Sequence, residues 1–199
     1  MDIAVDKPRH PHAFSRPPSR SRLLRSLHGC LAERIAWETV PVAAPVIDLS
    51  PRKGALSRAL ISRGVREENL VLVDRDNERV SFLRGRHPAA RILCVEATQI
   101  ATRRDVSFGR RAGVVVSRLA LARMAEHQVA GFLDDVFQHL LHEDGALYQI
   151  TSLPRCPVAP AVLQRLGLYA ERVAWVFWHL PPVAIYRINR PWLWSRLRL

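Results

Sequence analysis

The chain has 199 residues, of which 48% are hydrophobic and 24% charged, and its formal net charge is +12. This length suffices for one well-buried core, and the balance is that of a globular protein rather than of a disordered or membrane-spanning one. The basic surface favours anionic partners, whether nucleic acid, anionic lipid or an acidic protein. No apolar run approaches the roughly 20 residues of a transmembrane helix, and Met1 is not followed by the apolar stretch of a secretory signal. We expect a cytoplasmic protein, with peripheral attachment to the inner membrane face as a further hypothesis.

The first part of the chain changes from a polar arm to alternating strands and helices. Residues 1–18 are rich in proline, arginine and histidine, which predicts a disordered basic arm. Leucines at helical spacing predict an amphipathic helix over residues 19–37. The following apolar runs predict strands over residues 46–49, 70–73, 91–95 and 113–116, with helices over residues 55–62 and 77–86. Buried strands that alternate with helices indicate a parallel sheet covered on both faces.

The second part continues this pattern and then closes it. A continuous apolar stripe predicts a helix over residues 125–142, followed by a turn at Asp144–Gly145. Further segments are a strand over residues 146–151, a short helix over residues 161–166, and β-rich runs over residues 169–180 and 183–188. Pro181 and Pro182 separate the last two runs, which predicts an antiparallel hairpin. The fold class is therefore α/β, with a doubly wound, mostly parallel seven-stranded sheet over residues 19–190 and a Trp/Arg-rich tail over residues 191–199.

Acidic residues follow the first three predicted strands. Ligands of doubly wound sheets bind at the carboxyl ends of the strands, where the loop after the first strand reads VIDLSPRKGALSRAL. Asp48 and a turn that contains Gly54 are typical of a nucleotide-cofactor loop. Asp74 ends the second strand, where a carboxylate can accept ribose hydroxyls, and Glu96 follows the third, beside an adenine edge. Each acid alone is more typical of a solvated turn, but together they predict an adenosine-containing cofactor. Cys30, Cys94 and Cys156 form no CxxC pair, and we predict no metal site.

Several segments resemble one protein family. They are PPSRSRLLRSL, the loop quoted above, ENLVLVDRD, HPAARILCVEA, PVAPAVLQRLGLYAERV and WHLPPVAIYRI. Over about residues 17–190 the chain resembles the class I S-adenosylmethionine-dependent methyltransferases, and most of all the small bacterial phospholipid N-methyltransferases. The resemblance implies a Rossmann-like methyltransferase fold, S-adenosylmethionine as cofactor, and phosphatidylethanolamine as an acceptor that is methylated stepwise towards phosphatidylcholine.

The resemblance also implies roles for individual residues, although it assigns no catalytic residue. Those implied to bind the cofactor are Asp48, Ser50 and Gly54 in the loop, Asp74 at the ribose and Glu96 at the adenine. Ser117 and Arg118, at the end of the fourth strand, stand where the methyl-accepting amine would approach.

The chain departs from the family pattern at the loop. The family reads acid-Leu-Gly-Pro-Gly-Thr-Gly, whereas this chain reads Asp-Leu-Ser-Pro-Arg-Lys-Gly over residues 48–54. Ser50 and Arg52 replace glycines, and Arg52 and Lys53 bring positive charge towards a sulfonium cofactor. After the fourth strand, Arg-Leu-Ala replaces Gly-Leu-Pro, and Ser152 replaces an expected tyrosine. The alternative function is therefore a catalytically inactive methyltransferase-fold protein that serves as a membrane-surface or protein-binding module.

Two further interactions are considered from the sequence. Nucleic acid is a disfavoured partner, because residues 117–120 lack the Asn or Asp, Pro and aromatic residue that adenine-N6 methyltransferases place there. In the tail, Trp192, Trp194 and Arg196 are predicted membrane contacts, since tryptophan and arginine together suit the headgroup region. Packing of this tail on the surface of the domain is the open alternative.

Overall fold

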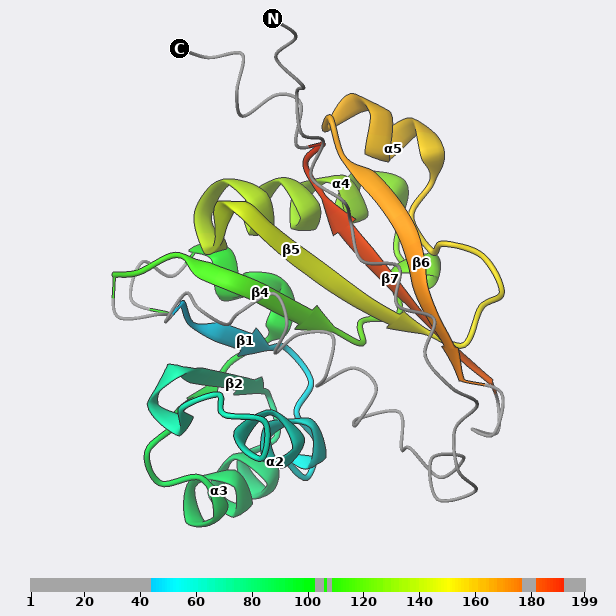
Figure 1. Ribbon diagram of the computed structural model, residues 1–199. Coiled ribbons are helices and arrows are strands. Elements are labelled where there is room, and N and C mark those ends of the chain that lie inside the picture. Colours follow the sequence, from blue (N-terminus) through cyan, green and yellow to red (C-terminus); the bar gives the residue numbers. More distant parts are fainter. Residues whose placement is uncertain (1–43, 103–105, 107–108, 177–181, 192–199) are drawn as a thin grey trace, which may run out of the picture.

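The computed structural model describes residues 44–102, 106, 109–176 and 182–191. Within them lies a seven-stranded sheet of order β3-β2-β1-β4-β5-β7-β6, in which β7 runs antiparallel to both of its neighbours (Figure 1). The strands are β1 (Val46–Asp48), β2 (Leu70–Asp74), β3 (Arg91–Cys94), β4 (Ala112–Ser117), β5 (Leu141–Thr151), β6 (Tyr169–Val176) and β7 (Val183–Asn189). The predicted fold class is confirmed, including the closing antiparallel hairpin of β6 and β7.

Helices connect the parallel strands and cover both faces of the sheet. The α-helices described are α2 (Ala55–Ile61), α3 (Asn77–Arg86), α4 (Glu126–Asp135) and α5 (Pro160–Arg165). Short 3₁₀ turns lie at η2 (Glu67–Asn69), η3 (Ala97–Thr102) and η4 (Leu121–Arg123), and a π-helical turn, η5 (Val136–Leu140), extends α4. The start of α3 is set by Asp76, whose side chain accepts a hydrogen bond from the Arg79 N–H at 3.0 Å, as N-cap residues do.

Alternate residues of the central strands enter two apolar cores, one on each face of the sheet. In β2, Leu70 and Leu72 join one core, whereas Val71 and Val73 join the other. The first core is completed by α2 and α3, and the second by α4, η5 and α5. Burial on both faces explains why these strands read as uninterrupted apolar runs rather than as alternating ones.

The boundary between α4 and β5 differs from the prediction. One helix was expected up to residue 142, but α4 ends at Asp135, η5 ends at Leu140, and β5 already begins at Leu141. Leu140 and Leu141 are both buried, so the apolar stripe continues from the helix into the strand without a visible break. The expected turn at Asp144–Gly145 lies inside β5, which runs through the exposed residues 142–144. Apolar periodicity alone does not separate a buried helix end from a buried strand start.

Some predictions fall outside the described residues. These are the basic arm, the helix over residues 19–37, and the membrane contacts Trp192, Trp194 and Arg196, all of which remain predictions. Within the described part of the chain, no helix is both long enough and apolar enough to pass through a bilayer.

Candidate functional site

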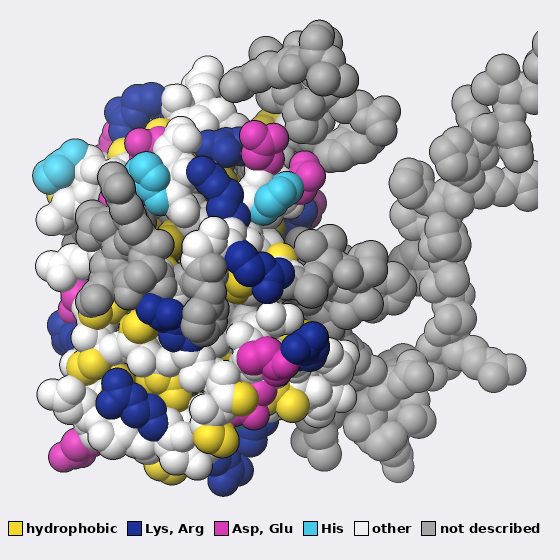
Figure 2. Space-filling model, turned by 90° about the vertical axis from the view of Figure 1, so that its left-hand side faces the viewer, with side chains coloured by type: hydrophobic (Ala, Val, Ile, Leu, Met, Phe, Trp, Pro, Cys, Tyr) yellow, Lys and Arg dark blue, Asp and Glu magenta, His cyan; other side chains and the backbone are white. Residues whose placement is uncertain are grey.

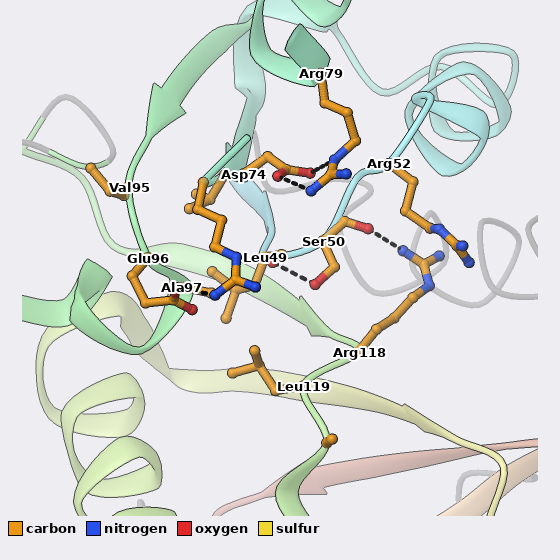
Figure 3. A pocket seen from close by; sticks show the side chains of 13 residues that line it. Leu49, Ser50, Arg52, Asp74, Arg79, Val95, Glu96, Ala97, Arg118 and Leu119 are labelled. Atoms are coloured by element: carbon orange, nitrogen blue, oxygen red, sulfur yellow. Dashed lines mark hydrogen bonds and ion pairs between the residues drawn. The ribbon is translucent and has the colours of Figure 1, made fainter. Parts of the chain in front are cut away.

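A cavity of about 510 Å³ opens at the carboxyl ends of β1 to β4, where the strand order reverses between β1 and β4 (Figure 3). This is the position at which doubly wound sheets bind ligands. The walls come from the loops that follow these four strands, and they include Ser50, Asp74, Glu96 and Arg118. Four of the predicted site residues are thus brought together in one cavity.

Asp74, at the end of β2, is held by an arginine of the next helix. Arg79 donates from Nε to Asp74 Oδ2 and from Nη2 to Asp74 Oδ1, both at 2.9 Å, and the Asp76 N–H donates to Oδ1 at 3.0 Å. Burial raises the pKa of Asp74, but the hydrogen bonds from Arg79 and from the backbone outweigh burial and lower it. Asp74 is therefore an ionised carboxylate whose two oxygens already have donors.

Glu96, after β3, also has an arginine partner. Arg75 Nη1 lies 3.2 Å from Glu96 Oε2, and both side chains are solvent-accessible, the arginine being 76% exposed and the glutamate 37%. Exposed pairs of this kind contribute at most about 1 kcal/mol, because water screens them. This pair can open at little cost, in contrast to the pair between Arg79 and Asp74.

Asp48 ends β1 behind the wall of the cavity rather than in it. Its side chain is buried, and Oδ1 accepts the Ser50 N–H at 3.0 Å, while Oδ2 has no hydrogen-bond partner among the described residues. Burial raises the pKa of Asp48, which the nearby Arg118 and the Ser50 N–H only partly offset. The resemblance implied that Asp48 binds the cofactor, whereas here its side chain holds the turn after β1 and does not line the cavity.

The loop after β1 contains two residues in the left-handed backbone region. Arg52 has φ of +52°, the only such value for a non-glycine residue in the described chain, and Gly54 has φ of +68°. Arg52 lines the cavity. Gly54 instead faces the core, where an added Cβ would lie 2.6 Å from His87 Nε2. The glycine predicted to contact a cofactor is thus required by packing.

His87 packs against this glycine and is almost fully buried. Its Nδ1 lies 3.8 Å from Glu67 Oε1. Burial lowers the pKa of His87, and the carboxylate of Glu67 offsets only part of that effect. A neutral imidazole therefore forms the surface on which the end of the loop rests.

Arg118, after β4, joins the two loops that flank the cavity. Its Nη1 donates to the Ser50 carbonyl at 2.7 Å and lies 3.7 Å from Asp48 Oδ1. Its Nη2 is buried and has no hydrogen-bond partner among the described residues. Figure 3 shows the Arg52 side chain extending towards this guanidinium. Two arginine side chains therefore line the part of the cavity next to the loop after β1.

Ser117 lies outside the cavity, although the resemblance placed it beside an acceptor. It is fully buried, and its hydroxyl accepts the Leu119 N–H at 3.2 Å. Gln149, on β5, donates to the Leu119 carbonyl at 3.0 Å. These two side chains fix the turn after β4, which leaves Arg118 and Leu119 to face the cavity.

The charge of the cavity is unusual for the binding of a cation. Among the described residues that line it, four are arginines and two are carboxylates, and each of these carboxylates has an arginine partner. On the face shown in Figure 2, by contrast, basic side chains lie at separate places among acidic, histidine and apolar ones. The described residues contain no group of three or more His, Cys, Asp or Glu side chains that could hold a metal ion.

The sequence predicted the acids of this site but not their arginine partners. Arg75 and Arg79 flank the helix start after β2, and although Arg75 lies in the ENLVLVDRD segment, the resemblance assigned no role to either arginine. The only signal in the sequence was the distance of Arg79 from Asp74. The helix α3 begins at Asn77, shortly after Asp74, and Arg79 lies in its first turn.

The fold and this crevice can be compared with known proteins. No family model matches the sequence, and no curated protein matches it. A TehB-like S-adenosylmethionine-dependent methyltransferase from Corynebacterium glutamicum superposes with a TM-score of 0.57 and 15% identity, over 86% of this chain and 92% of that one. A magnesium protoporphyrin IX methyltransferase from Synechocystis, solved with bound S-adenosylmethionine, gives a TM-score of 0.58 and 13% identity, over 82% and 80%. A putative methyltransferase from Escherichia coli gives 0.54 and 16%, over 88% of each chain.

The chain has the fold of the class I methyltransferases. Identities of 13 to 16% establish a shared architecture and no more. What this methyltransferase-fold protein binds has to be argued from the side chains of the cavity.

Proposed function

We propose that this chain is a catalytically inactive, ligand-binding member of the methyltransferase fold, one that does not use S-adenosylmethionine as a methyl donor. The observation that supports this proposal is the pair between Arg79 and Asp74. In the resemblance, Asp74 is the acid that holds the ribose of the cofactor, and here both of its oxygens accept hydrogen bonds from the protein itself.

Oδ1 of Asp74 already accepts two hydrogen bonds and Oδ2 one, so a ribose could use both oxygens only if the pair with Arg79 opened. The side chain of Asp74 is only 8% exposed. If Arg79 moved away, the charge of Asp74 would have neither its partner nor much water around it. Hydrogen bonds to charged groups contribute about 1.5–3 kcal/mol, and each 1.4 kcal/mol corresponds to about tenfold in affinity. The residues present therefore do not fit the ribose of the cofactor well.

The charge of the cofactor opposes binding as well. S-adenosylmethionine carries a sulfonium and an ammonium group against one carboxylate, so it is a net cation. It would enter a cavity lined by four arginines and two paired carboxylates, with Arg52 and Arg118 at the end formed by the loop. Like charges at short range in a partly enclosed site repel each other, which weakens binding further.

Calorimetric titration of the full chain with S-adenosylmethionine tests the proposal. We expect no detectable binding to the natural sequence. Binding should appear when Ser50→Gly, Arg52→Gly and Arg79→Ala are combined, because these changes remove the loop side chains and free the ribose acid. Adding Asp74→Ala to that triple variant should abolish the gained binding. Micromolar binding by the natural sequence would contradict the proposal.

An active phospholipid N-methyltransferase is the second candidate. It is favoured by the size of the cavity and by the presence of Asp74 and Glu96 in one crevice, as the resemblance implies. The structural neighbours do not narrow the acceptor, since they include a porphyrin methyltransferase and a glycopeptide N-methyltransferase, the latter solved with sinefungin at a TM-score of 0.57. Transfer of a labelled methyl group to vesicles that contain phosphatidylethanolamine would establish this function.

The predicted membrane contact can be examined separately from catalysis. Trp192, Trp194 and Arg196 make the tail suited to anionic headgroups. A chain that ends at Arg190 should sediment less with anionic vesicles than the full chain does. Equal sedimentation would exclude the tail as the anchor.

A further inference from the structure

Arg52 and Arg118 line the cavity next to the loop after β1, and neither guanidinium is closely paired with a carboxylate. Arg52 has no carboxylate within ion-pair distance among the described residues, and Arg118 has Asp48 only at 3.7 Å. The Nη2 group of Arg118 is buried and makes no hydrogen bond there. A buried donor without an acceptor is uncommon in folded proteins, and the Arg118 guanidinium has to turn Nη2 towards the cavity for a ligand oxygen to satisfy it.

The backbone at Arg52 also indicates a ligand contact. A non-glycine residue in the left-handed region costs about 1–2 kcal/mol, and such strain concentrates at binding sites. Arg52 lines the cavity, and Figure 3 shows its side chain extending towards Arg118. Without an anion between them, the two positive groups only repel each other.

Part of the lining of the cavity is apolar, and it consists of Val73, Val95, Ala97 and Leu119. Figure 3 shows Val95 and Ala97 on the side away from Arg52 and Arg118. The pair of Arg75 and Glu96 lies on that side as well. A volume of about 510 Å³ exceeds what a phosphate group alone fills and lies in the range of small-molecule sites. The cavity thus offers an apolar surface for a ring system at a distance from a doubly basic end.

We propose that this cavity binds a nucleoside phosphate, with its phosphate at Arg52 and Arg118 and its base against the apolar walls. The fork of donors on a guanidinium matches phosphate oxygens, so two converging arginines form a strong phosphate site. Asp74 and its partner Arg79 also line the cavity and give the nucleoside a polar neighbour. This inference rests on the proposed function, since the same crevice cannot hold S-adenosylmethionine at the same time.

Ligands that share one nucleoside and differ in charge test the inference. The full chain is titrated calorimetrically with adenosine, adenosine monophosphate, adenosine diphosphate, glycerol phosphate and S-adenosylmethionine. We expect the two nucleotides to bind at least about tenfold more tightly than adenosine, since charge-assisted hydrogen bonds contribute about 1.5–3 kcal/mol. Added salt should reduce this difference, because screening weakens the contact with the exposed Arg52.

A matched pair of variants locates the phosphate. Arg52→Gly removes one guanidinium from the cavity and relieves the strained backbone, so the variant is expected to fold. Its affinity for the nucleotides should fall about fivefold or more, while its affinity for adenosine stays the same. Lys53→Gly removes the same charge from the next residue, which is exposed and does not line the cavity, and should leave nucleotide affinity unchanged.

Each outcome bears on a separate claim. Equal affinity for adenosine and its phosphates, or no binding of any nucleotide, would overturn the inference while leaving the proposed function intact. Equal loss of affinity in both variants would overturn the assignment of the phosphate to Arg52. Glycerol phosphate binding as tightly as the nucleotides would overturn the nucleoside part. If S-adenosylmethionine bound most tightly of all, the proposed function would fail as well.

Discussion

Arg52 and Gly54 lie two residues apart in the loop after β1, and both adopt the left-handed backbone conformation. At Gly54 the space for a side chain is closed, because an added Cβ would lie 2.6 Å from His87 Nε2 and 3.2 Å from Leu83 Cδ2. At Arg52 the side chain extends into an open cavity. In the resembling family both positions are glycine, yet only the one that faces the core is glycine here.

This difference separates two constraints that a glycine-rich loop normally combines. One is the packing of the loop on α3, and the other is the approach of a bare backbone to a ligand. The chain keeps the first and has lost the second. The two apolar cores likewise keep the regular packing of a doubly wound sheet. The crevice differs, because arginines pair with both of the carboxylates that line it.

Gly54→Ala should have the largest effect of the changes that test this contrast. The left-handed conformation costs an alanine about 1–2 kcal/mol, and crowding against a buried side chain adds about 1–3 kcal/mol. The free energy of unfolding, measured with urea, should therefore fall by roughly 2–5 kcal/mol.

Gly64→Ala provides the matched control for that measurement. Gly64 has φ of +94°, and nothing lies within 4 Å of a Cβ added there. Its replacement should cause only the conformational loss of about 1–2 kcal/mol. If both alanine variants lost the same stability, the contact between Gly54 and His87 would not be a constraint on the loop.

Arg79→Ala should have an intermediate effect that depends on pH. Near neutral pH the loss of both hydrogen bonds to Asp74 should destabilise the fold, by less than the Gly54→Ala change does, because solvent screens the partly exposed Arg79. The pKa of Asp74 is lowered in the folded state, so the contribution of the pair is present above the usual carboxyl pKa and disappears as pH falls through the folded-state value. Urea unfolding near pH 7 and near pH 3 should show a smaller difference between variant and natural chain at the lower pH.

Arg84→Ala is the control on the same helix. Arg84 is exposed and does not line the cavity, so its loss should change neither stability nor its pH dependence to any large extent. An Arg79→Ala effect of equal size at both pH values would mean that Asp74 does not depend on Arg79 for its ionisation.

The sequence predicted the parts of the molecule that apolar patterning determines. Runs such as residues 70–73 indicated buried strands, and strand ends indicated where Asp74 and Glu96 would meet. The start of β5 at Leu141 was missed, because a buried helix end and a buried strand start have the same composition. Arg79 was missed for a different reason. A charged residue on a short helix looks solvated in a sequence, and only the direction in which α3 leaves β2 turns its side chain back to Asp74.

Arg52→Gly should have the smallest effect on stability and the most informative sign. Relief of the left-handed strain would stabilise the fold by about 1–2 kcal/mol, whereas the added freedom of glycine in the unfolded chain removes about 0.4–1 kcal/mol. A net gain between about 0 and 1.6 kcal/mol is expected in urea unfolding.

Lys53→Gly is the reference for that gain. Lys53 is exposed, adjacent and equally charged, but its backbone is not in the left-handed region, so the change to glycine should only destabilise, by about 0.4–1 kcal/mol. The difference between the two variants isolates the strain at Arg52 from the loss of one charge. A stability gain in Arg52→Gly together with weaker nucleotide binding would mean that Arg52 binds the ligand at a cost in the stability of the fold. A loss of stability like that of Lys53→Gly would instead make Arg52 an ordinary surface residue, and the contrast with Gly54 would reduce to packing alone.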